Sequence, residues 1–157
     1  AGVVARAGAG LILGHLRGNP ETMQREIHFD DVLREVADEL EESARAAEAA
    51  GVARSRLVVD PGIGFGKLRE HNLALLARAG ELRARLGLPL LVGPSRKRFL
   101  GEPVGGEPHE RDAASAAACA VAVFAGADAV RVHDVAGAAR AVAVAFALRE
   151  ARAEGGT

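Results

Sequence analysis

The sequence predicts an α/β protein with a parallel sheet that is buried on both faces, and two observations indicate this fold. Short, continuously apolar segments alternate with longer segments of helical periodicity, an order typical of parallel strands joined by crossover helices. A cluster of polar residues directly follows each apolar segment. Four such units in 157 residues fit either half of a (β/α)8 barrel or a small, open, doubly wound sheet.

The order of elements is expected to begin with the end of a helix and to continue as alternating strands and helices. The expected strands are residues 11–13, 56–59, 90–92 and 129–132. The expected helices are residues 1–7 and about 31–50, 70–86, 109–125 and 138–153. In the first long helix, apolar residues recur at helical spacing, Asp30 or Asp31 can cap its start, and Gly51 ends it. Residues 101–108 hold three Gly and two Pro, which predicts a loop.

Charge and cysteine content limit the partners and the compartment. The formal net charge of -1 gives no reason to expect nucleic acid or an anionic membrane as a partner. Cys119 is the sole cysteine, so no internal disulfide forms and a reducing cytoplasm is the expected compartment. No apolar run approaches the roughly 18 residues of a transmembrane helix, and the first residues do not resemble a secretory signal.

Basic residues follow a strong bias toward arginine. Of the 20 basic residues, only Lys67 and Lys97 are lysines. Lys97 belongs to the cationic cluster of residues 95–98, where like charges repel each other unless an anion is near. A slender ammonium suits a buried ligand contact that a planar guanidinium would not fit. For Arg96 and Arg98, taken singly, an ordinary solvated basic loop is the favoured interpretation.

Asp60 stands where the second strand becomes a glycine-rich turn, residues 60–67. Its carboxylate could accept two parallel hydrogen bonds from an amino-heterocycle, and the glycines would let backbone approach a flat ligand. The alternative interpretation is a turn or helix-capping aspartate, because Asp before Pro-Gly commonly has that role.

Arg131 and His133 alternate with valines, so a strand would point both polar side chains to one side. In a barrel that side is the interior mouth, where a phosphate or pyrophosphate would satisfy both residues. The alternative is an internal salt bridge from Arg131 to Asp134 or to another acid. His15, after the first strand, is either a core histidine or a ligand contact.

Four strings together resemble the dihydropteroate synthase family. Residues 15–24 read HLRGNPETMQ, residues 60–67 read DPGIGFGK with His71 and Asn72 following, and residues 93–97 read GPSRK. The last string pairs Glu110-Arg111 with RVHDV at residues 131–135. Their order and spacing match that family across nearly the whole chain.

The resemblance implies a (β/α)8 TIM barrel of the pterin-binding type, of which residues 1–157 supply about the last four β/α units. The N-terminal half of the single domain, with the ligand for Mg²⁺, would precede this sequence. It also implies a transferase that joins 6-hydroxymethyl-7,8-dihydropterin pyrophosphate to 4-aminobenzoate, a homodimer and small-molecule partners only. This half alone is expected to be inactive.

The resemblance also implies a role for each matching residue. The catalytic residues would be Lys97, Arg131 and His133. Asp60, Gly64 and Lys97 would hold the pterin; Arg131 and His133 would bind the pyrophosphate; and Phe65, Lys97 and Arg98 would contact the 4-aminobenzoate.

The sequence departs from the family pattern at several pocket positions. Arg98 stands where a serine is common, Ala114-Ser115 replaces Gly-Ser/Thr, and Gly14 and Leu16 replace larger residues or methionine. A pterin-binding methyltransferase domain is the nearest rival, but it would not need residues 95–97 or 131–133. A degenerate barrel that binds without turnover is the non-enzymatic alternative.

Overall fold

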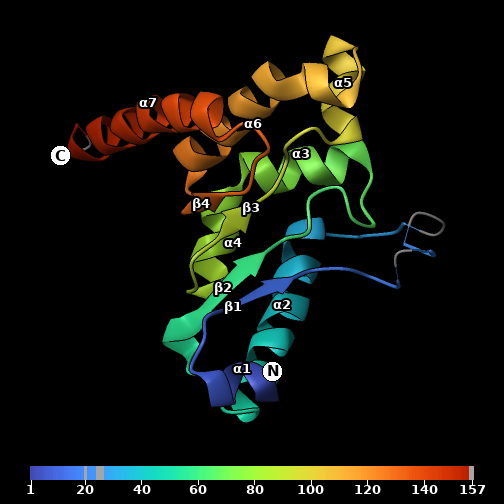
Figure 1. Cartoon of the computed structure of the whole chain (residues 1–157), viewed down its shortest axis with the longest axis vertical. Helices are drawn as coiled ribbons and strands as arrows, with labels where there is room; N and C mark the ends of the chain where they lie inside the picture. The colour runs from blue at the N-terminus through green and yellow to red at the C-terminus, as the bar shows by residue number, and fades with distance from the viewer. Residues whose placement is uncertain (20, 24–26, 156–157) are drawn as a thin grey trace.

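The computed structural model describes residues 1–19, 21–23 and 27–155, so Pro20 and Gln24 of the first motif lie outside it. Strands and helices alternate along the chain (Figure 1). The strands are β1 (Leu11–Gly14), β2 (Leu57–Asp60), β3 (Leu91–Val92) and β4 (Ala129–Val130). The helices are α1 (Gly2–Ala7), α2 (Val32–Ala49), α3 (Arg69–Ala77), α4 (Ala79–Leu86), α5 (Arg98–Val104), α6 (Asp112–Ala125) and α7 (Val135–Glu154). Two 3-10 turns are η1 (Arg54–Arg56) and η2 (Pro108–Arg111).

All four strands run parallel in the order β1-β2-β3-β4. Leu11 pairs with Leu57 and Gly14 with Asp60, which aligns the ends of β1 and β2. A parallel bridge between Val59 and Leu90 joins β2 to β3, and β3 pairs with β4 in the same direction. The carboxyl ends of the strands therefore meet at one edge, as expected for consecutive units of a barrel.

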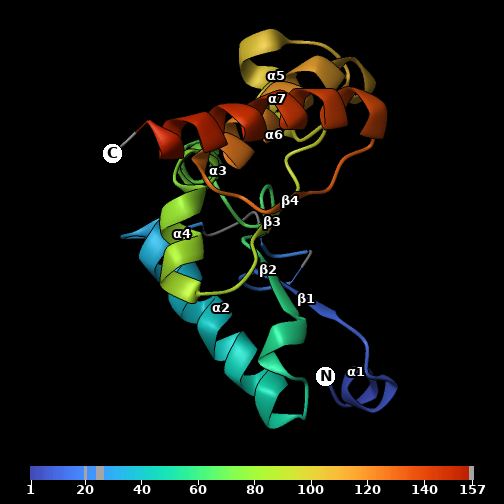
Figure 2. The same cartoon turned by 90° about the vertical axis from the view of Figure 1, so that its left-hand side faces the viewer.

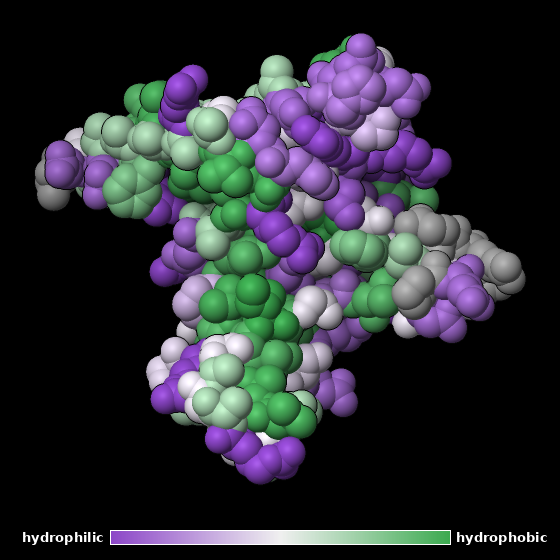
Figure 3. Space-filling model, viewed as in Figure 1, coloured by the Kyte–Doolittle hydropathy of each residue, from purple (hydrophilic) through white to green (hydrophobic). Residues whose placement is uncertain are grey.

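Helices cover one face of these strands. Figure 2 shows α2 and α4 along one side, with no described element running along the other. Val59, Leu90 and Val92 point to the helices and are fully buried, whereas Ile12 on the opposite face is 56% exposed. In Figure 3 hydrophobic side chains form a band over the strands on this uncovered face.

The expectation of a sheet buried on both faces is thus wrong for this chain. Helices bury only the outer face. A barrel's inner face is filled by side chains from strands all round the ring, and this chain supplies four of them.

The expected helix over residues 70–86 is two helices. The chain leaves helical geometry at Arg78, where φ is -112° and ψ is 29°. Beyond this break α4 packs on the end of α6, and a Cβ atom on Gly126 would lie 2.7 Å from Cα of Gly80. This close backbone contact is tertiary and leaves no periodic signal in the sequence.

The expected loop over residues 101–108 is also partly wrong. Helix α5 extends to Val104 with Pro103 inside it. Phe99 and Leu100 are buried and anchor its first turn, so tertiary packing overrides the local Gly and Pro signal.

Strand β4 ends at Val130, two residues earlier than expected. Arg131 still donates its backbone N–H to the carbonyl of Val92 at 3.0 Å, so the pairing continues one residue further. Helix α7 begins at Val135 rather than Ala138, because Asp134 caps it by accepting the N–H of Gly137 at 3.1 Å.

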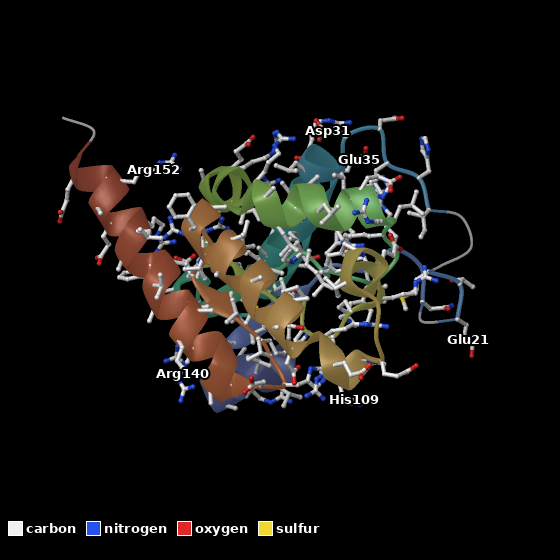
Figure 4. All side chains as sticks on the ribbon, turned by 90° about the horizontal axis from the view of Figure 1, so that it is seen from above. Glu21, Asp31, Glu35, His109, Arg140 and Arg152 are labelled. Atoms are coloured by element: carbon white, nitrogen blue, oxygen red, sulfur yellow. The ribbon has the colours of Figure 1, made fainter. Side chains whose placement is uncertain are left out.

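Helix α2 begins where the sequence indicates. Asp31 accepts the N–H of Arg34 at 3.0 Å, and Glu35 reaches back to the N–H of Asp31 at 2.8 Å. Figure 4 labels Asp31 and Glu35 together at this helix start, far from Arg140 and Arg152 on α7. No described helix meets the length and hydropathy required of a bilayer-spanning segment.

Candidate active site

Asp60 lies at the end of β2, nearly buried with 5% of its surface exposed. Its Oδ1 accepts the backbone N–H of Gly62 at 2.8 Å. The turn role considered for this residue is therefore real, but it occupies one oxygen. Oδ2 faces Nη2 of Arg131 at 3.5 Å, so the carboxylate also points into the space between the strand ends.

Arg131 meets Asp60 across 71 positions of sequence, while Asp134 caps α7. Arg131 therefore forms its internal ion pair with Asp60 and not with Asp134. The guanidinium lies over Gly93, where a Cβ atom would be 3.4 Å from Nε. Its side chain remains 65% exposed, which leaves most of the guanidinium able to bind an anion.

His133 is held by Ser95 at the end of β3. Oγ of Ser95 lies 2.9 Å from Nδ1 of His133 and accepts the backbone N–H of His133 at 3.2 Å. These two contacts fix the ring on the same strand-end edge as Arg131. Sequence reasoning did not assign Ser95 a role of its own.

Lys97 precedes α5, and its Nζ lies 3.9 Å from the ring centroid of Phe65. Burial lowers the pKa of Lys97, and the positive charge of Arg131 lowers it further, while Asp60 opposes the shift. Arg131 lies 3.5 Å from Asp60, and Lys97 packs against Gly64 in the turn that follows Asp60, so the three charged side chains converge at the strand ends. The stem of Lys97 packs against Gly64, where a Cβ atom would lie 2.9 Å from Cδ.

Arg96 is not a solvated loop residue. Its guanidinium binds Asp112 through two hydrogen bonds of 2.8 Å, and its backbone N–H donates to Oγ of Ser115 at 2.9 Å. Its φ of 59° lies in the left-handed region that non-glycine residues rarely adopt. This turn directs Ser95 toward His133 and Lys97 toward Phe65.

His15 is a core histidine, buried with a partner on each ring nitrogen. Nε2 lies 3.0 Å from Glu39, and Nδ1 lies 2.8 Å from Nζ of Lys67. Sequence reasoning did not single out Lys67 as a site residue. The signal was available, because Lys67 and Lys97 are the two lysines that survive the bias toward arginine.

An open pocket of about 760 Å³ adjoins these residues. Its charged lining residues are four cations, Lys67, Arg69, Lys97 and Arg98, and two acids, Glu70 and Glu102, so positive charge is in excess. Arg98 is exposed at the first position of α5. Flat aromatic surface from Phe65, a carboxylate and several cations suit a planar, polar ligand with an anionic group.

The family model described as pterin binding enzyme matches residues 1–133. The dihydropteroate synthase of Synechocystis sp. is 44% identical over 147 residues, covering 93% of this chain and 50% of the relative. That of Escherichia coli is 44% identical over 131 residues, covering 83% of this chain and 46% of the relative. The chain therefore spans about half the length of these relatives.

Solved structures agree with the sequence comparisons. Dihydropteroate synthase of Thermus thermophilus in complex with 6HMPPP has a TM-score of 0.86 at 46% identity, covering 94% of this chain and 58% of that one. The Yersinia pestis enzyme in a sulfonamide drug complex has a TM-score of 0.89 at 37% identity, covering 94% and 53%. The fold is accordingly about half of a TIM barrel of the pterin-binding type, and the chain belongs to the pterin-binding enzyme family.

Proposed function

We propose that the complete protein is a dihydropteroate synthase, a transferase of folate biosynthesis. It would condense 6-hydroxymethyl-7,8-dihydropterin pyrophosphate with 4-aminobenzoate to give 7,8-dihydropteroate and pyrophosphate. The observation that carries the proposal is the convergence of Asp60, Lys97 and Arg131 at one edge of the strands. Relatives named for this reaction and a Thermus thermophilus structure with 4-aminobenzoate support it.

The pterin is assigned to Asp60, Gly64 and Lys97. An ionised carboxylate accepts two hydrogen bonds from neighbouring N–H groups of an amino-pyrimidine. Oδ2 of Asp60 faces the guanidinium of Arg131, while Oδ1 is held by the turn. Gly64 leaves the space that the stem of Lys97 fills, and the ammonium can donate to a pterin carbonyl or ring nitrogen.

The pyrophosphate is assigned to Arg131 and His133, and the 4-aminobenzoate to Phe65, Lys97 and Arg98. Arg131 would bind phosphate oxygens through charge-assisted hydrogen bonds, and His133 would donate a ring N–H to them. The exposed ring of Phe65 would lie against the arylamine. Arg98 would meet its carboxylate, in a geometry that differs from the serine common in the family.

The chemistry required of these residues is mainly electrostatic. The bond between the pterin methylene carbon and the pyrophosphate oxygen breaks, and the bonding electrons leave with pyrophosphate. The amine nitrogen of 4-aminobenzoate then attacks the resulting cationic carbon and loses a proton. Fixed cations at the leaving oxygens and a carboxylate beside the positively charged pterin lower the barrier by pre-organisation.

Among the described residues no group of three or more His, Cys, Asp or Glu side chains could hold a metal ion, so no step is assigned to Mg²⁺ here. We place its ligand in the N-terminal half of the barrel, which would precede residues 1–157. Cytoplasmic location and a homodimer are proposed from the family resemblance.

The test uses the complete protein encoded with its upstream region. We expect wild type to form dihydropteroate, and Asp60→Asn to weaken pterin binding at least tenfold by calorimetry. Asp38→Asn, an exposed substitution on α2, is the matched control. Arg131→Ala should weaken the binding of the pterin pyrophosphate much more than the binding of the pterin alcohol. Equal losses for both ligands would instead favour a pterin-binding methyltransferase.

A further inference from the structure

Lys67 is a buried cation with two fixed partners. Only 5% of its surface is exposed. Its Nζ lies 2.8 Å from Nδ1 of His15 and donates to the carbonyl oxygen of Phe65 at 3.1 Å. The side chain therefore links the end of β1 to the tip of the glycine-rich turn that holds Phe65.

The hydrogen bonds assign the proton on His15. An ammonium only donates, so Nδ1 of His15 accepts from Lys67 and Nε2–H donates to Glu39. Burial, followed by the charge of Lys67, lowers the pKa of His15 to about 4, so the ring is neutral at pH 7. A neutral ring is the form that this chain of hydrogen bonds needs.

The charges around Lys67 come from three elements. Asp60 on β2 and Glu39 on α2 favour the ammonium, whereas Arg17, beyond the end of β1, opposes it. Burial is the largest effect and lowers the pKa of Lys67 to about 8. Lys67 therefore remains mostly charged at neutral pH, close to the carboxylate that we assign to the pterin.

The turn of residues 60–66 packs closely against His15 and Lys67. The backbone N–H of His15 donates to the carbonyl oxygen of Asp60 at 2.9 Å. A Cβ atom on Gly62 would overlap the carbonyl oxygen of His15 and come within 3.4 Å of Nζ of Lys67. Asn72 holds the same turn from the other side, its Oδ1 accepting the N–H of Gly64 at 2.6 Å.

We propose that Lys67 is a positioning residue that joins the end of β1 to the turn of residues 60–66, and so sets Asp60 and Phe65 in register for both substrates. This inference rests on the proposed function. Although Lys67 also lines the pocket, its hydrogen bonds run to His15 and Phe65, so we assign its effect to the turn. Loss of the linkage should thus disturb the pterin and 4-aminobenzoate together.

The test compares Lys67→Met and Lys67→Arg in the complete protein, with Arg45→Met, an exposed substitution on α2, as control. Calorimetry measures Kd for pterin pyrophosphate, kinetics give kcat and KM for 4-aminobenzoate, and thermal unfolding reports stability. Lys67→Met should raise both Kd and KM at least tenfold. Lys67→Arg, which keeps a cation, should recover part of the loss, and Arg45→Met should match wild type.

The outcomes separate this inference from the proposed function. If the wild-type protein neither forms dihydropteroate nor binds the pterin, the proposed function is refuted. If the wild-type protein is active and Lys67→Met has Kd and KM within twofold of the wild-type values, the positioning role is refuted, even if the melting temperature falls. Should Lys67→Met not fold, His15→Leu and His15→Asn replace it. The asparagine retains an acceptor for Lys67, so equal binding by these two variants would likewise refute the inference.

Discussion

Gly64 provides the surface on which the stem of Lys97 rests, and this contact can be tested with one methyl group. In Gly64→Ala the new Cβ would lie 2.9 Å from Cδ of Lys97, at a φ of 80°. Gly87→Ala is the matched control, because φ there is 60° and no atom lies within 4 Å. Both substitutions should cost about 1 kcal/mol of unfolding free energy, measured in urea, through left-handed backbone strain.

Only Gly64→Ala should also weaken substrate binding, because only it displaces Lys97. We expect KM for 4-aminobenzoate and Kd for the pterin to rise at least fivefold in the complete protein. If Gly87→Ala weakened binding equally, the effect would be one of general stability rather than of contact with Lys97.

Lys97 itself can be tested by keeping its charge. Lys97→Arg places a wider, rigid guanidinium between Phe65 and Gly64, where the lysine stem is already tightly packed. We expect kcat/KM to fall at least tenfold, about 1.4 kcal/mol of transition-state stabilisation. Arg96→Lys should reduce kcat/KM less and lower the melting temperature, since Arg96 binds Asp112. Equal kinetics for wild type and Lys97→Arg would show that position 97 does not require lysine.

At the scale of elements, the connection between β3 and α5 depends on a strained residue held from α6. Asp112, at the start of α6, binds Arg96 through two hydrogen bonds. The hydrogen bond from Arg96 lowers the pKa of Asp112 below its ordinary 3.8. A carboxyl with a lowered folded-state pKa stabilises the fold above its unfolded pKa, and this stabilisation is lost as pH falls through the folded value.

Asp112→Asn should therefore be less stable than wild type at neutral pH, with the difference shrinking as the pH falls below 3.8. Chemical unfolding at a series of pH values measures it. Glu42→Gln on α2, an exposed substitution, serves as the control. A stability difference that is the same at pH 3 and pH 7 would show that the Arg96 to Asp112 ion pair does not support the turn.

For the whole molecule, the uncovered face of the strands sets the behaviour of residues 1–157 alone. Ile12 is 56% exposed on this face. Among the described strands, β1 pairs with β2 alone and β4 pairs with β3 alone, so β1 and β4 are edge strands. Open parallel edges and exposed apolar surface favour association between copies. We predict that the isolated segment aggregates in light scattering and forms no dihydropteroate. Turnover by the isolated segment would contradict this.

The order of strands and helices and the strand-end clusters could be predicted from the sequence because their signals are local. Apolar periodicity located α2 and β2 to within a residue or two. The alternation of Arg131 and His133 with valines predicted that both lie on the edge that carries Asp60, and Arg131 does contact Asp60 there. The rarity of lysine pointed to Lys97 before any contact was known.

Tertiary structure alone decided which partner each charged group took. Arg131 binds Asp60 rather than its neighbour Asp134, and Arg96 binds Asp112 rather than solvent. The break at Arg78 lies beside a close backbone contact between Gly80 of α4 and Gly126 at the end of α6. Lys67 is a positioning candidate only because residues 15, 39, 60 and 65 surround it. These outcomes depend on burial and on distances between residues far apart in sequence, and local propensity contains neither.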